Sequence, residues 1–267
     1  MSRCPSKRLV ALARLCYSQH TRGGCHFLWV GGTGCRLEGY RKTHEEKKFM
    51  KITAVKSLAI PDIRVVRFAR FRDERGYFTE SYRMSDFRAH PQTGFIGNAT
   101  FLQGNESYSD RGVIRGLHFQ WNPVMGKLVR TVVGHMVDLV LDIRKGSPTF
   151  GKIIAYDMPS AVGDGHGEWI WVPPGFAHGN FFLAPTQVEY FCSAEYSPGH
   201  EAGISPWSGD LDWSLCDAQL REHFSALAAH GILSDKDRRG LTLHAWSEDP
   251  RSDNFIYGRG DNAKDRE

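Results

Sequence analysis

The sequence predicts an all-β fold, a sandwich or a barrel of short strands. From residue 52 onward, short apolar runs alternate with turns rich in Gly, Pro, Asn and Asp. The clearest turn signals are Pro61-Asp62, Asp73 to Gly76, Lys145 to Pro148 and Pro173 to Gly175. Closely spaced strands and turns of this kind are typical of antiparallel sandwiches and barrels. The sequence contains no internal repeat that would indicate a solenoid or a propeller.

Two apolar, β-branched runs give the strongest strand signals. They span residues 129–133 and 136–143, and Gly134-His135 separates them. Two other stretches have helical character, residues 84–90 and residues 217–229, and in the second the apolar residues recur at helical spacing. We therefore expect a sheet-based core with a few short helices.

Composition and charge argue against two classes of partner. The chain of 267 residues is 41% hydrophobic, which is enough to fill a core, and no apolar run reaches the length of a membrane span. The net charge of +4 is unevenly placed, because residues 1–49 carry ten Lys and Arg against three Glu, which leaves the remainder at −3. We therefore expect no nucleic-acid surface and no membrane insertion, and any bound anion requires a local cationic cluster.

Cysteine usage indicates a reducing compartment. Four of the six cysteines fall in the N-terminal segment at spacings that match no common zinc pattern, and the other two are isolated. These residues are Cys4, Cys16, Cys25, Cys35, Cys192 and Cys216. A disulfide framework is not expected, and we predict a cytoplasmic protein.

Residues 1–49 differ in character from the rest of the chain. They include Gly-rich stretches, contain no acidic residue before Glu38 and show little periodicity. We interpret them as a disordered or mis-called extension, with Met50 as the native start. An organelle-targeting segment is the alternative, because the stretch carries Arg and is poor in acids.

The most informative stretch runs from Gly112 to Gln120, and Lys127 follows His118 by nine residues. An imidazole can take up a proton near neutral pH, an ammonium can stabilise the negative charge left behind, and a guanidinium can hold an anion. On adjacent strands, Arg115, His118 and Lys127 would face one concavity, a combination suited to proton abstraction beside a carbonyl. Taken alone, the trio is equally compatible with structural residues.

Several motifs accompany this stretch. They are Asp73 to Tyr82, Gln103 to Ser107, Arg115 to Gln120, Asp142 to Gly151, Pro174 to Gly179, Tyr190 to Pro198 and Ser234 to Asp237. Their content and order resemble the dTDP-4-dehydrorhamnose 3,5-epimerase family. The resemblance implies a domain over residues 50–267, with a cupin-type jelly-roll β-sandwich at about 52–240 and a C-terminal tail after it. It also implies a homodimer whose subunits share strands and substrate contacts.

The resemblance implies a role for each of four catalytic residues. His118 matches the family's proton acceptor, Asp237 the acid that orients it, Tyr190 the proton donor and Lys127 the group that stabilises the enolate. A carboxylate on one imidazole nitrogen fixes the tautomer and stabilises the imidazolium, which suits a base of this kind. From the residues alone, Tyr190 would fit core packing and Asp237 a turn cap.

The resemblance also implies the substrate-binding residues. Arginine side chains suit a diphosphate through forked hydrogen bonds, and an aromatic ring suits stacking on thymine. Tyr196 matches the stacking position and His178 a sugar contact. The remaining matches are Arg75, Glu80, Gln103, Asn105, Arg115, Glu201 and Lys236.

Two features of the sequence qualify the match. The strand-like segments contain His118, His135 and His178 but no His-X-His pair, so no metal site is predicted. The stretch from 213 to 234 is longer than in the family by roughly a dozen residues. Because this insertion directly precedes Asp237, the position of Asp237 is the least secure of the transferred residues.

The implied activity is cofactor-free epimerisation at C3 and C5 of a dTDP-4-keto-6-deoxy sugar. It would convert dTDP-4-dehydro-6-deoxy-D-glucose to dTDP-4-dehydro-L-rhamnose, a precursor of surface polysaccharide. Three alternatives remain: a single-site 3- or 5-epimerase or 3,4-ketoisomerase of deoxysugar biosynthesis, a non-catalytic sugar-nucleotide-binding cupin, and a metal-dependent cupin oxygenase or isomerase. Retention of His118 with Tyr190 favours epimerisation over isomerisation, and retention of His118 with Lys127 argues against a binding-only role.

Overall fold

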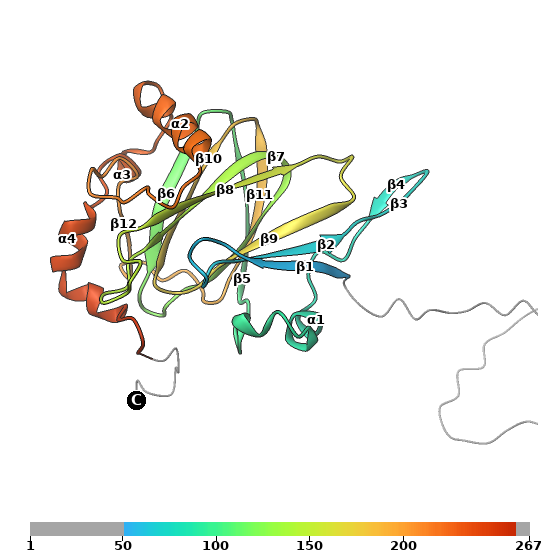
Figure 1. Ribbon diagram of the computed structural model, residues 1–267, viewed down its shortest axis with the longest axis horizontal. Coiled ribbons are helices and arrows are strands. Elements are labelled where there is room, and N and C mark those ends of the chain that lie inside the picture. The colour runs from blue at the N-terminus through green and yellow to red at the C-terminus, as the bar shows by residue number, and fades with distance from the viewer. Residues whose placement is uncertain (1–50, 260–267) are drawn as a thin grey trace, which may run out of the picture. The chain divides into compact units, whose positions relative to one another are not determined.

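The computed structural model describes residues 51–259 (Figure 1). The extension predicted for residues 1–49 lies outside the described residues. Within them, strands dominate, joined by short helices. The strands are β1 (Ile52–Ser57), β2 (Arg64–Ala69), β3 (Phe71–Asp73), β4 (Gly76–Phe78), β5 (Gln103–Ser109), β6 (Ile114–Gln120), β7 (Lys127–Asp142), β8 (Ile153–Ser160), β9 (His166–Val172), β10 (Phe176–Phe182), β11 (Thr186–Cys192) and β12 (Glu201–Gly203).

The strands form two antiparallel layers that share β7. The first half of β7 pairs with β9 and β11, and its second half pairs with β10 and β8. One layer therefore has the order β1-β2-β9-β7-β11-β5, and the other has the order β8-β7-β10-β6-β12. This arrangement confirms the predicted all-β sandwich.

The runs predicted at 129–133 and 136–143 belong to one continuous strand, β7, which bends at Gly134. Gly134 has a φ of +113°, and a Cβ atom there would lie 2.4 Å from the carbonyl oxygen of Pro185. Only glycine fits such a position without strain. The glycine that suggested a break between two strands instead lets a single strand pass from one layer to the other.

Apolar side chains fill the space between the two layers. Val129 and Ile170 of the first layer meet Met136, Val140 and Ile154 of the second, and all five are buried. Burial of a side chain of this size contributes about 1.5–3 kcal/mol relative to exposure. The inward faces therefore hold the sandwich together.

The helices cover the outer faces of the sandwich (Figure 1). They are α1 (Met84–Ala89), α2 (Ala218–Ala226), α3 (Asp235–Arg238) and α4 (Leu243–Glu248), with 3₁₀ turns at Gly94–Ile96, Leu227–Ala229 and Pro250–Asn254. Phe224 of α2 and Trp246 of α4 join an apolar cluster with β7, while Phe87 of α1 packs on the other layer. The segment after residue 240, predicted as a tail, packs into the same cluster through Phe255.

Both predicted helical stretches are confirmed as α1 and α2. The Asp217 carboxylate caps α2 by accepting hydrogen bonds from the backbone N–H groups of Gln219 and Leu220. The sequence patterns did not predict α3 or α4, which are only one to two turns long. No helix within residues 51–259 is long and apolar enough to cross a membrane.

The motif from Asp142 to Gly151 shapes the turn between β7 and β8. The Asp142 carboxylate is fully buried and accepts hydrogen bonds from Arg144, Ser147 and Thr149. Burial raises the pKa of Asp142, but these hydrogen bonds outweigh it and hold the pKa below its ordinary value. The motif is thus explained by local folding.

The β3–β4 hairpin projects from the sandwich on the side away from α2, α3 and α4 (Figure 1). Its aromatic side chains Phe71, Tyr77 and Phe78 are exposed, with Phe78 at 68%. Arg75 at its tip is also exposed and bonds only to the neighbouring Asp73 among the interactions of the described chain. The hairpin thus presents apolar rings and an available guanidinium to the surroundings.

Candidate active site

A pocket of about 270 Å³ lies among β5, β6, β7, β11 and β12. Strand β5 supplies two amide side chains, β6 and β7 supply the histidine and the lysine singled out above, and β11 supplies a tyrosine and a cysteine. The lining residues are Gln103, Asn105, His118, Phe119, Gln120, Met125, Lys127, Tyr190, Cys192, Tyr196 and Glu201. Seven of the thirteen predicted site residues therefore line one concavity.

Strand register explains why these side chains converge. Side chains two residues apart in a strand share a face, and directly paired residues of neighbouring strands lie side by side. Cys192 pairs with Lys127 on one side and with Gln103 on the other, and Tyr190 pairs with Asn105. The floor of the pocket is thus one continuous patch of three neighbouring strands.

His118 forms a close pair with Asp237. The Nε2 atom of His118 lies 2.5 Å from Oδ1 of Asp237, whose side chain is 7% exposed. The backbone N–H of Gly116 contacts the other carboxylate oxygen at 3.4 Å. Burial raises the pKa of Asp237, but the hydrogen bonds, led by that from His118, outweigh it and keep the pKa below its ordinary value. The carboxylate is therefore ionised and fixes the orientation of the imidazole.

Gly116 permits the close approach of β6 to β10 beside this pair. Its φ is +103°, and a Cβ atom there would lie 2.6 Å from the backbone of both His178 and Gly179. A larger residue would push β6 away from β10 and displace His118, two residues further along. The glycine of the Arg-Gly-Leu-His motif is therefore required for the position of the base.

The segment that carries Asp237 is anchored on both sides of this residue. Ile232 exchanges backbone hydrogen bonds with the chain at Gly112 and Ile114, and Leu241 does so with Gly203 and Ser205. Between these anchors, the Ser234 hydroxyl caps α3 by accepting the N–H of Asp237. Asp237 thus reaches His118 despite the insertion that made its position insecure.

Lys127 brings an unpaired positive charge to the pocket. It makes no hydrogen bond or ion pair with any of the described residues. Burial lowers the pKa of Lys127, and the nearby Cys192, Asp138 and Glu201 offset this only in part. A buried ammonium without a partner is costly, so this position favours an anionic or strongly polarised ligand oxygen.

Tyr190 and Cys192 remain neutral on the same face of β11. Burial raises the pKa of the Tyr190 phenol, and the charge of Arg115 opposes this effect. Burial also raises the pKa of the Cys192 thiol, which accepts a hydrogen bond from Asn105 at 3.6 Å. Tyr190 therefore carries its proton at neutral pH and can donate it.

The rim of the pocket is a small hydrogen-bonded group around Glu201. Its Oε1 atom accepts from Lys236 Nζ at 2.5 Å and from the Tyr196 hydroxyl at 3.2 Å. The backbone N–H of Tyr196 donates to Gln103 at 2.8 Å. Glu201, Tyr196 and Lys236 are thus brought together, as the sequence predicted, beside the His118–Asp237 pair.

Five predicted binding residues do not line the pocket, namely Lys236, which bonds to Glu201 at the rim, and four others. His178 is buried behind it, with Nε2 2.7 Å from Asp138 Oδ2. Arg115 hydrogen-bonds to Ser109 and the carbonyl of Tyr108. The other two, Arg75 and Glu80, belong to the β3–β4 hairpin and the segment just after it, where Glu80 bonds to Arg83. Their substrate contacts remain predictions.

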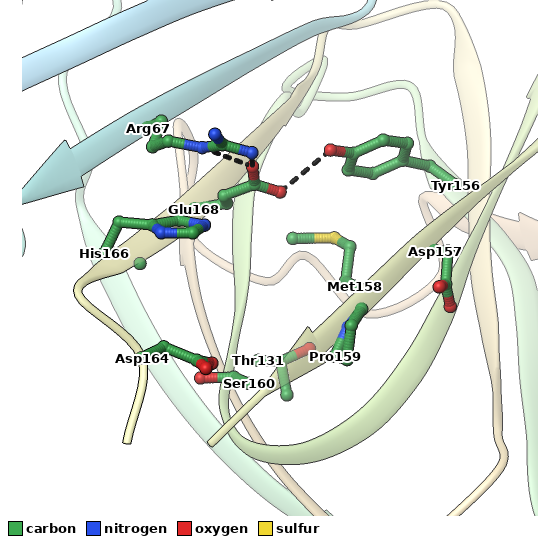
Figure 2. Close-up of a pocket in the computed structure, with 11 residues that line it drawn as sticks. Arg67, Thr131, Tyr156, Asp157, Met158, Pro159, Ser160, Asp164, His166 and Glu168 are labelled. Carbon is green, nitrogen blue, oxygen red and sulfur yellow. Dashed lines mark hydrogen bonds and ion pairs between the residues drawn. The ribbon is translucent and has the colours of Figure 1, made fainter. Parts of the chain in front are cut away.

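A second pocket, of about 230 Å³, lies among β2, β7, β8 and β9 (Figure 2). Its central carboxylate, Glu168, accepts hydrogen bonds from Arg67 at 2.6 and 2.9 Å and from the Tyr156 hydroxyl at 2.8 Å. None of the predicted site residues lines it. The central charges of this pocket are already paired, whereas Lys127 is not, so the pocket at His118 is the better candidate for an active site.

Comparison with known proteins identifies the family. A family model described as dTDP-4-dehydrorhamnose 3,5-epimerase matches residues 57–245. The chain belongs to the dTDP-4-dehydrorhamnose 3,5-epimerase family. The resemblance carried by the motifs and the jelly-roll fold that it implied are both confirmed.

Individual members of this epimerase family match over most of their length. The chain is 37% identical over 190 residues to a dTDP-4-dehydrorhamnose 3,5-epimerase of Pseudomonas aeruginosa, covering 68% of this chain and 92% of that protein. A Legionella pneumophila 3,5-epimerase solved with dTDP-4-keto-L-rhamnose is 30% identical, with a TM-score of 0.62 and coverage of 76% and 97%. A 3'-monoepimerase from Streptomyces bikiniensis solved with dTDP-quinovose is 26% identical, with a TM-score of 0.59 and coverage of 72% and 88%.

Sequence reasoning missed four of the residues that line the pocket, Phe119, Gln120, Met125 and Cys192. Gln120 and Cys192 each lie two residues beyond a predicted site residue, His118 and Tyr190, so strand periodicity could have found them. Met125 precedes β7 and had no such signal, because its place depends on the turn after β6. Within residues 51–259, no three His, Cys, Asp or Glu side chains are grouped so that they could hold a metal ion.

Proposed function

We propose that this chain epimerises dTDP-4-dehydro-6-deoxy-D-glucose at C3 and C5 to give dTDP-4-dehydro-L-rhamnose. The observation that carries the proposal is the His118–Asp237 pair, which shares one pocket with the unpaired Lys127 and the neutral Tyr190. This set supplies a base, an electrophile and an acid, and these are the groups that inversion beside a carbonyl requires.

His118 acts as the base in this proposal. With Nε2 directed at Asp237, the proton of the neutral ring lies on Nε2, and Nδ1 has no partner among residues 51–259. The free Nδ1 then accepts the proton from C3 or C5. Asp237 stabilises the imidazolium that forms, as carboxylates do in other His–Asp pairs.

Lys127 and Tyr190 complete the cycle. Removal of the proton places negative charge on the C4 oxygen, and the Lys127 ammonium stabilises this enolate. Tyr190 then donates its phenolic proton to the same carbon from the opposite face. His118 releases the abstracted proton to water and Tyr190 takes one up from water, so both are ready for the next inversion. His118 lies in β6 of one layer and Tyr190 in β11 of the other, which supports attack and return from different sides. These steps are proton transfers and require no redox cofactor.

The nucleotide lies at the rim of the pocket in this proposal. Tyr196, with its ring 55% exposed, stacks on thymine, and Gln103 and Asn105 donate and accept hydrogen bonds below it. On binding, Lys236 gives up its ion pair with Glu201 and pairs with the diphosphate instead. Arg115 adds a second cation beside Tyr190.

Inversion at a single carbon is the second candidate. It is favoured by the likeness to the 3'-monoepimerase from Streptomyces bikiniensis, which shares the fold at 26% identity. The same base and acid would catalyse this reaction, and only the number of carbons whose protons exchange with solvent would differ.

We further propose a homodimer in which the hairpin of each subunit reaches the pocket of its partner. This would bring Arg75 and Glu80 to the nucleotide and would bury the exposed rings of Tyr77 and Phe78. The epimerase domain in this proposal begins at Met50, and its cytoplasmic location stays a prediction.

Proton exchange tests the reaction directly. During incubation with dTDP-4-dehydro-6-deoxy-D-glucose in D2O, we expect proton NMR to show deuterium entering at both C3 and C5. His118→Ala should slow the exchange about 10²–10⁴-fold. Exchange at C3 alone would support the monoepimerase instead. A lack of exchange at both carbons would contradict the proposed activity.

We also expect activity to fall at alkaline pH as Lys127 loses its proton. Burial lowers the pKa of Lys127, so its ammonium loses its proton at a lower pH than an ordinary lysine does. The alkaline limb of the kcat profile should therefore lie below the ordinary lysine value of 10.5. Lys127→Arg keeps its charge to higher pH and should move this limb upward. If the alkaline limb of the Lys127→Arg profile does not move, the limb reports the deprotonation of a group other than Lys127.

The homodimer is tested by light scattering on the full chain. We expect about twice the chain mass of 30.2 kDa. Phe78→Asp, which places a charge on the exposed ring position, should shift the mass toward the monomer and reduce kcat/KM at least about tenfold. Tyr257→Asp serves as a control, because the Tyr257 ring is also exposed but lies beside Arg144, away from the hairpin. A monomeric wild-type chain at micromolar concentration would exclude the shared site.

A further inference from the structure

The lining of the active pocket combines polar side chains with a few apolar ones. Of its side chains, only Met125, Phe119 and Cys192 carry neither an oxygen nor a nitrogen atom. The Phe119 ring packs away from the pocket, 4.5 Å from Trp246 between ring centres. Met125 and the neutral thiol of Cys192 are therefore the side chains without oxygen or nitrogen that face the pocket, and we call them its apolar corner.

Met125 and Cys192 both flank Lys127. Cys192 is the direct cross-strand neighbour of Lys127. The pairing continues beyond the strand, because Gly126 and Ser193 exchange hydrogen bonds at 2.8 and 2.9 Å. Met125, in the turn just before Gly126, lines the same pocket as Lys127 and Cys192. The apolar corner is adjacent to the charge that would hold the C4 oxygen.

The chemistry of a 4-keto-6-deoxyhexose matches this corner. Its sugar ring carries hydroxyl groups and one apolar substituent, the C6 methyl, on the carbon next to C4. If Lys127 holds the C4 oxygen, the methyl lies beside Lys127 as well. A methyl group placed against Met125 and Cys192 leaves no polar atom unsatisfied, whereas a C6 hydroxyl there would lose its hydrogen bonds to water.

We infer that Met125 and Cys192 form the subsite for the C6 methyl and select 6-deoxy sugars over 6-hydroxy sugars. The inference rests on the proposed epimerase function and adds its substrate specificity. An apolar pocket of this kind discriminates by about 10–200-fold for a methylene and by about 100-fold against an added hydroxyl. We therefore expect the wild-type protein to prefer the 6-deoxy sugar by about 100-fold in kcat/KM.

The experiment compares deuterium exchange of two substrates, dTDP-4-dehydro-6-deoxy-D-glucose and dTDP-4-dehydro-D-glucose, in the full-length protein. Met125→Gln has a similar length but offers hydrogen bonds at the corner, and it should reduce the kcat/KM ratio of the two substrates at least about tenfold. Met125→Leu should retain most of the preference. Val162→Gln, on the exposed β8–β9 turn, controls for an added amide elsewhere.

Each outcome bears on the inference separately from the proposed function. Exchange by the wild-type protein with equal kcat/KM for both sugars would overturn the methyl subsite and leave the epimerase function standing. A strong preference that Met125→Gln does not change would also overturn it. No exchange with either sugar would remove the proposed function, and the subsite with it. Because the ratio is measured within one variant, partial loss of folded protein does not affect it.

Discussion

The contact between His118 and Asp237 is the interaction on which the site depends. The two residues are 119 positions apart in the chain, and their side chains meet at 2.5 Å. This contact needs β6 pressed against β10, which Gly116 permits, and it needs α3 held at the end of β6 by the backbone bridges of Ile232 and Leu241. A single displaced element would leave a buried carboxylate without its partner, and such a group is strongly destabilising.

The rest of the pocket follows from the architecture of β7. Because the strand bends at Gly134, its first half contributes Lys127 to one layer while its second half contributes Asp138 to the other. The apolar layer around Val129 seals the pocket floor and lowers the pKa of Lys127 by excluding water. The packing that stabilises the sandwich therefore also holds the Lys127 ammonium in a site with little water, where it can stabilise an enolate.

Much of this could be predicted from the sequence, because it depends on local patterns. Strand periodicity and turn residues predicted the all-β fold, and family motifs predicted seven of the residues that line the pocket. The patterns could not show that β7 is continuous, because a glycine between two apolar runs is expected both where a strand bends and where it ends. They could not establish the position of Asp237, because it depends on the backbone hydrogen bonds that Ile232 and Leu241 make with distant strands. They also missed Met125, whose position depends on a turn. Arg75 and Glu80 depend on a second subunit in our proposal, so one chain alone does not position them.

The most direct test of the account is the effect of Asp237→Asn on kcat and on dTDP affinity, measured by deuterium exchange and by calorimetry. The amide keeps the size of the carboxylate but loses its charge and favours the wrong imidazole tautomer. The account predicts a fall in kcat of about 10³–10⁴-fold with the Kd for dTDP changed by less than about threefold. A kcat within about tenfold of the wild-type value would contradict the central role of the His118–Asp237 pair.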